Sequence, residues 1–109
     1  MDNIISDLEL LQSQAMKIGN LFFSLDDKSA LSSIDKFSSN LNNTYIKLAS
    51  SEYINILPEN ALNNLNAIFN NIILGIQNKD YILLGDLFVY ELSPLVKNII
   101  SNLNQSFLS

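Results

Sequence analysis

Two pairs of polar residues near the C-terminal end of the chain are spaced as catalytic pairs could be. Ser93 and Lys97 lie four residues apart, a separation that places a hydroxyl nucleophile and a lysine on one helix face. Asp86 and Glu91 are five residues apart, and a helix turns such residues roughly 140° from each other. A lysine activates a serine only in a desolvated setting, and nothing in the sequence around Lys97 predicts burial. We therefore expect both pairs to be polar surface groups.

The residue types that most often carry enzymatic and metal chemistry are missing from this sequence. It contains no His and no Cys, which removes the usual general base, the usual nitrogen ligand and every thiolate site. A metal site made only of carboxylates would need acids from several helices to converge inward. The acids here lie mostly at expected helix starts and on polar faces. We expect no enzymatic activity, no bound metal and no organic cofactor.

The charge balance argues against polyanionic partners. Eleven Asp and Glu residues outnumber six Lys, there is no Arg, and the net charge is −5. Nucleic acids and anionic membranes require clustered positive charge, so we expect neither as a partner. The N-terminus lacks the basic start of a secretory signal, and the most apolar window, residues 81–96, is too short and too interrupted to span a membrane. A cytoplasmic location is the resulting expectation.

Apolar residues recur at helical spacing through nearly the whole chain. We expect a single domain, residues 1–109, folded as an all-α, up-and-down antiparallel four-helix bundle, because the turns between the helical segments are short. The first helix is expected at about residues 3–25, with Asp2 as a cap. Its apolar seam has heptad spacing and consists of Ile4, Leu8, Leu11, Ala15, Ile18, Phe22 and Leu25.

The second and third helices are marked by caps and a proline. Asp26 or Asp27 can cap the second helix, whose one narrow apolar stripe predicts a single buried face. Residues 50–57 either continue this helix or form a packed connection. Pro58 suits the first turn of the third helix. Four phenylalanines are predicted core residues, and three glycines are predicted to allow close approach of helix backbones. These are Phe22, Phe37, Phe69 and Phe88, and Gly19, Gly75 and Gly85.

The fourth helix is expected from residue 81, after the cap Asp80, to about residue 103. Pro94 lies inside it, removes the hydrogen bond to the Tyr90 carbonyl and predicts a kink. One apolar seam is sufficient to face the core, and it consists of Tyr81, Leu84, Phe88, Leu92, Leu95 and Ile99. A second seam recurs on the opposite face at spacings of 4, 3 and 4, and it consists of Leu83, Leu87, Tyr90 and Pro94.

The second seam must be covered by something, because a helix that is apolar nearly all round is normally buried on all sides. Residues 50–57 or 107–108 of the same chain are one possible cover. A second copy of the chain or another protein is the other. If a second copy or another protein covers this seam, its four residues form a partner-binding strip. We therefore predict a protein partner or a homodimer through the fourth helix.

A short C-terminal stretch carries a family resemblance. Residues 80–87, followed by Tyr90-Glu91-Leu92 and Pro94-Leu95, resemble the C-terminal helix of small uncharacterised helical-bundle proteins of Gram-positive spore formers, some of which look to be encoded near motility genes. In size, acidity and helicity the chain is also similar to flagellar export chaperones, through architecture and without a shared motif. These resemblances imply a protein partner and no cofactor.

Several functions remain open at this point. The chain is expected to be a non-enzymatic, protein-binding bundle that acts as an adaptor or as a chaperone similar to those of flagellar export. One alternative is a small acidic inhibitor of the immunity type, which would neutralise a toxin through charge and surface shape. Another is a homodimer whose seam serves assembly alone. An enzyme with a carboxylate site is the least favoured.

Overall fold

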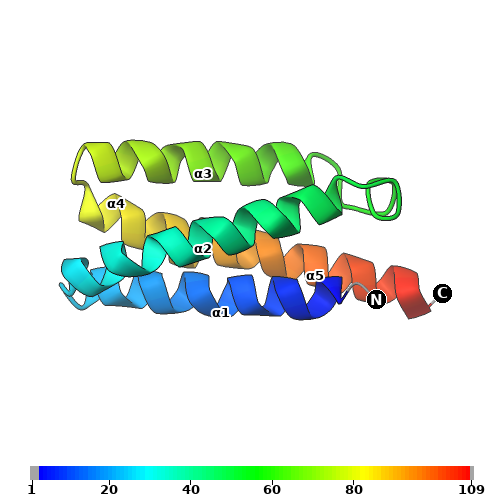
Figure 1. Ribbon diagram of the computed structural model, residues 1–109, viewed down its shortest axis with the longest axis horizontal. Coiled ribbons are helices and arrows are strands. Elements are labelled where there is room, and N and C mark those ends of the chain that lie inside the picture. Colours follow the sequence, from blue (N-terminus) through cyan, green and yellow to red (C-terminus); the bar gives the residue numbers. More distant parts are fainter. Residues whose placement is uncertain (1–2, 109) are drawn as a thin grey trace.

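The computed structural model describes residues 3–108, and in that range the chain is an all-α bundle with no β-strand, as predicted. Three helices are followed by a fourth that contains three consecutive segments (Figure 1). The elements are α1 (Ile4–Phe23), α2 (Asp27–Leu48), α3 (Ala61–Gln77), α4 (Tyr81–Asp86), the π-helical segment η1 (Leu87–Leu92) and α5 (Ser93–Leu108). The predicted four-helix bundle is therefore confirmed.

The helices form an elongated bundle of 44 × 21 × 20 Å. α1 packs closely against both α2 and the fourth helix, and α3 packs against the fourth helix. The turns α1–α2 and α3–α4 lie together at one end of the bundle, and the longer α2–α3 connection lies at the other end, with the C-terminus (Figure 1). α2 and α3 are not among the closely packed pairs, so this edge of the bundle is more open than the others.

Asparagine and aspartate side chains start three of the helices. The Oδ1 atoms of Asn3, Asp26 and Asp80 accept backbone hydrogen bonds from residues three positions later, at 3.2, 3.3 and 3.1 Å. These bonds satisfy amides that have no partner within the helix. Asp2, the expected cap of α1, lies outside the described residues. Pro58 is not in the first turn of α3 as predicted, because that helix begins after Asn60, at Ala61.

The apolar seams of α1 and α2 form the core largely as predicted. Phe22, Phe37 and Phe88 are buried, and the ring of Phe37 meets that of Phe88 edge-on at 5.3 Å between centroids. Phe69 is only half-buried, because α3 leaves its flank toward α2 uncovered. The last member of the first seam, Leu25, is wrongly placed by the heptad pattern, since α1 ends at Phe23 and Leu25 lies exposed in the turn.

Close backbone approach explains the glycine in α1. A Cβ atom at Gly19 would clash with the side chain of Val89 and would lie 3.2 Å from the Cβ of Phe88 and 3.4 Å from the carbonyl oxygen of Gly85. No larger residue fits there unless the side chain of Val89 is displaced. At Gly75 the same atom would meet the side chain of Leu84 at 2.9 Å. The predicted close approach of helix backbones is therefore found at Gly19, whereas at Gly75 and Gly85 a side chain of the neighbouring helix occupies the space of the missing Cβ atom.

Residues 49–60 form a packed connection of turns, which settles the ambiguity left by the sequence. Tyr53 is buried, and its ring lies 6.5 Å from that of Phe107. The side-chain amide of Asn102 donates a hydrogen bond of 3.2 Å to the carbonyl of Ile56. The connection therefore covers the C-terminal part of α5, at the end of the bundle remote from the start of α4 (Figure 1).

Candidate protein-binding surface

A change of helical register in η1 corrects the predicted partner-binding strip. The buried positions Leu84, Phe88, Leu92 and Val96 are each four residues apart, and a regular α-helix would carry such a series roughly 120° around its axis. The wider turns of a π-helix absorb this drift. As a result Leu87 faces the core and is only 2% exposed, so its placement on the outer face was wrong.

The other three residues of the strip do reach the surface. Tyr90 and Pro94 are exposed, and Leu83 is just over one-third exposed. The ring of Tyr90 lies beside that of Phe23 from α1, with centroids 6.0 Å apart and planes tilted by 39°. The fourth helix therefore presents an aromatic pair shared with α1, in place of a straight strip of four residues.

The aromatic pair is part of a larger apolar surface at the α1–α2 end of the bundle. Leu25 and Ile82 share the lining of one hollow there, and the ring of Phe23 covers Gly85, one helical turn after Ile82. Leu25 is 85% exposed, Ile82 78%, Tyr90 68% and Phe23 42%. We call these four residues the end patch. Scattered single apolar residues are normal on a protein surface, but exposed apolar side chains gathered at one end, two of them neighbouring aromatic rings, are typical of an interaction site.

The sequence indicates why Phe23 and Ile82, which were not part of the predicted strip, lie on the surface. Phe22 and Phe23 are adjacent, so a helix places them about 100° apart and only one can face the core. Ile82 belongs to neither seam of the fourth helix. Apolar residues outside every seam are the ones that a bundle leaves exposed.

The surroundings of the end patch are more acidic than basic. Asp26 precedes α2, Asp80 precedes α4, and Asp86 is one turn from both Ile82 and Tyr90. All three are exposed. Asp27 and Lys79 also line the hollow, and Lys28 follows in the first turn of α2. Four carboxylates thus face two lysines at this end.

The two pairs considered for catalysis are arranged differently in space. Lys97 is exposed as expected, but Ser93 is buried, so its expected place on the polar surface was wrong. Glu91 lines a shallow hollow against α3, and Asp86 does not. Among residues 3–108, no group of three or more acidic side chains is arranged to hold a metal ion. Over the same range, no helix combines the length and apolarity needed to cross a membrane.

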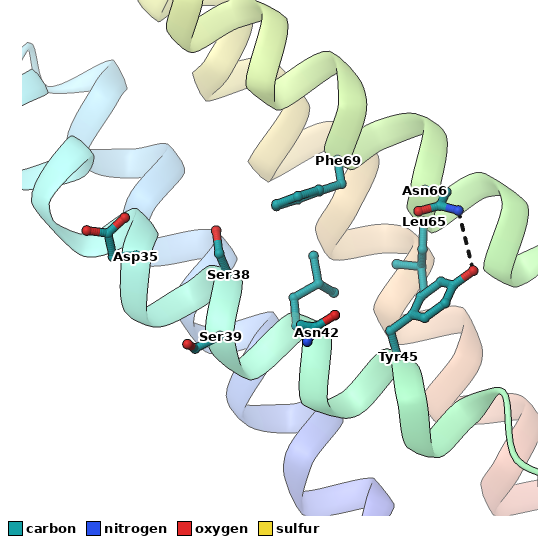
Figure 2. A pocket seen from close by; sticks show the side chains of 9 residues that line it. Asp35, Ser38, Ser39, Asn42, Tyr45, Leu65, Asn66 and Phe69 are labelled. Carbon is teal, nitrogen blue, oxygen red and sulfur yellow. Dashed lines mark hydrogen bonds between the residues drawn. The ribbon is translucent and has the colours of Figure 1, made fainter.

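A second candidate surface is a groove of about 480 Å³ between α2 and α3. In Figure 2 the ring of Phe69 extends from α3 into the space beside the wall of α2 that carries Ser38. Further along, the Asn66 amide donates a hydrogen bond of 3.4 Å to the Tyr45 hydroxyl and links the two walls. The remaining lining residues are Asp35, Ser39, Leu41, Asn42 and Leu65.

The groove has less apolar surface to offer a partner than the end patch has. Its floor residues Leu41 and Leu65 are already buried, and only Phe69 and Tyr45 keep partly exposed rings. Association driven by apolar burial scales with the area removed from water. The end patch, with three side chains more than two-thirds exposed, is therefore the stronger candidate.

Comparison with known proteins identifies a family without a described activity. No curated protein and no solved structure matches this chain. The family model of the domain of unknown function DUF8042 matches residues 1–102, which is nearly the whole chain. The chain therefore belongs to the family of the domain of unknown function DUF8042.

Proposed function

We propose that this protein is a non-enzymatic adaptor or chaperone-like bundle of the cytoplasm that binds another protein through the end patch. The observation that carries the proposal is the exposed pair Phe23 and Tyr90, which two different helices bring together at 6.0 Å. Tyrosine and phenylalanine are enriched where proteins meet, because each ring removes a large area from water at little cost in side-chain entropy.

The support of the patch by the bundle strengthens the proposal. Phe23 lies against the backbone of Gly85, and Leu25 and Ile82 flank a hollow whose inner wall includes Phe22 and Tyr81. The ring of Phe22 stacks on that of Tyr81 at 5.9 Å and on that of Phe88 at 6.4 Å. A patch held on packed helices is preorganised, so little conformational entropy is lost when a partner binds to it.

A photo-crosslinking amino acid placed at Tyr90 tests the proposal in the native host. We expect one dominant crosslinked protein, identified by mass spectrometry, and loss of that product when Phe23→Ser is added. The matched control carries the same amino acid at Asn63, an exposed position of α3 outside the patch.

Two outcomes would contradict the proposal. The first is the absence of any specific product from Tyr90. The second is the same product from Asn63, which would show that crosslinking does not depend on the patch. A product between two copies of this chain would instead identify a homodimer and reject the adaptor function.

A further inference from the structure

We infer that the partner segment recognised by the end patch is a cationic amphipathic helix. This inference rests on the proposed function and adds the chemistry of the partner. The patch offers exposed apolar side chains, and the carboxylates beside and between them are called its acidic edge. Leu25 is followed directly by Asp26, and Ile82 is preceded by Asp80 and followed one turn later by Asp86.

The positions of the carboxylates match a helix whose apolar face has basic flanks. Asp86 lies between Ile82 and Tyr90 on the same helix, one turn from each. Asp27 and Asp80 line the hollow between Leu25 and Ile82, and among the described residues Lys79 is the one basic side chain in that lining. The Oδ1 atom of Asp27 is shielded from solvent and accepts no hydrogen bond within the described residues. A lysine or arginine of the partner would thus meet more carboxylates than ammonium groups at this end of the bundle.

The same charges disfavour two other occupants. In a symmetric dimer through this patch, the acidic edge of one copy would face the acidic edge of the other, and like charges at an interface repel. An anionic membrane surface would be repelled as well. A basic segment gains both the apolar contact and the complementary charge, and charge complementarity also speeds its association.

Substitutions of Asp by Asn remove negative charge from the acidic edge of the patch and keep the side-chain caps of the helices. Asp26→Asn and Asp80→Asn keep a side-chain oxygen that caps equally well, and Asp86→Asn changes an exposed site. The matched control is the triple variant Asp35→Asn, Glu52→Gln and Glu59→Gln, all exposed residues outside the end patch. Each triple variant changes the net charge from −5 to −2, since three negative charges are lost.

The probe is a synthetic helical peptide with one leucine face and one lysine face, and its counterpart has glutamate in place of lysine. Fluorescence anisotropy with the full chain should show the lysine peptide binding about tenfold more tightly than the glutamate peptide, with affinity falling as salt rises. The triple variant at the edge should lose most of this preference, and the control triple variant should keep it. Tyr90→Ser should weaken the binding of both peptides.

Three results would overturn the inference. Equal binding of the two peptides would show apolar recognition alone. If both triple variants lost the preference for the lysine peptide equally, the preference would depend on the overall charge of the chain. Self-association in sedimentation without peptide binding would assign the patch to a second copy. Failure here is separable from failure of the proposed function, because crosslinking at Tyr90 can still reveal a partner whose bound segment carries no positive charge.

Discussion

The backbone N–H of Ser93 donates its hydrogen bond to the carbonyl of Phe88, five residues earlier instead of four. This bond belongs to η1 and comes immediately before Pro94, which has no N–H and whose ring disfavours a regular α-helical turn. A wider turn at this point accommodates the proline and moves the register of the residues around it. Leu87, three residues after the buried Leu84 and still bonded to the Leu83 carbonyl, can then stay on the core side of the helix.

Leu87→Ala should therefore destabilise the fold by about 2–5 kcal/mol, and Leu87→Lys by more, because the lysine would place an unpaired charge in the core. The matched control is Leu83→Ala, one turn earlier at a partly exposed site, which should cost less than about 1 kcal/mol. Urea unfolding followed by circular dichroism measures both. A Leu87→Lys protein as stable as the parent would restore the outer-strip interpretation.

Phe→Ala substitutions should cost more stability at the fully buried phenylalanines than at the half-buried one. Phe37→Ala and Phe88→Ala should each cost about 3–5 kcal/mol. Because their rings meet edge-on, the double variant should show a coupling energy of about 0.5–1.5 kcal/mol. Phe69→Ala should cost less than about 2 kcal/mol, since its ring is half-buried at the α2–α3 groove. If Phe69→Ala and Phe88→Ala lowered the free energy of unfolding equally, the groove between α2 and α3 would be closed in solution.

Gly19→Ala should lower stability although alanine is the better helix former. Alanine favours a helix over glycine by about 1 kcal/mol. At this site, however, the added methyl would have to displace Val89 and press against Phe88, and overpacking of this kind costs about 1–3 kcal/mol. Asn20→Ala, the exposed neighbour in α1, should instead be neutral or slightly stabilising. Thermal melts of the two variants in the same buffer make the comparison.

The parts of the fold that follow a constant period could be predicted from the sequence. Ile4 to Phe22 in α1 are buried at heptad spacing, the cap Asp80 was predicted from residue type, and the cap Asp26 was one of the two predicted candidates. The outer strip failed at Leu87 because a pattern analysis assumes one period throughout a helix, whereas η1 changes it. Leu25 failed for a different reason. The apolar period continues past Phe23, but the helix does not, and exposure at a helix end depends on where the chain turns.

The end patch could be predicted only in part, because it joins residues far apart in the sequence. Tyr90 was identified from its position opposite the core-facing seam, but its contact with Phe23 depends on how α1 and the fourth helix are aligned along their axes. That alignment is determined by side-chain packing, including the close approach at Gly19. Spacing within one helix carries no information about it. The acidic edge has the same origin, since Asp27 and Asp80 line one hollow only because the two turns that precede α2 and α4 lie at one end of the bundle.

Leu25 combines an unfavourable backbone with an exposed apolar side chain, and this combination yields the last prediction. Its φ angle is 62°, in the left-handed region that glycine adopts most readily. The amide of Asp26 donates to the carbonyl of Leu21 at 2.9 Å and that of Leu25 to Phe22 at 3.1 Å, so the turn is a Schellman motif with leucine at the usual glycine position. Leu25→Gly should stabilise the fold by about 1 kcal/mol.

The same substitution should weaken binding, because it removes the most exposed apolar side chain of the end patch. Lys79→Gly is the matched control. Lys79 has a φ angle of 53° and the same hydrogen-bond pattern at the end of α3, with the amide of Asp80 donating to the Gly75 carbonyl at 2.9 Å. It should gain similar stability, yet bind the lysine peptide as well as or better than the parent, since an opposing charge is lost. A Leu25→Gly protein that is more stable and binds undiminished would show that leucine at this position does not serve binding.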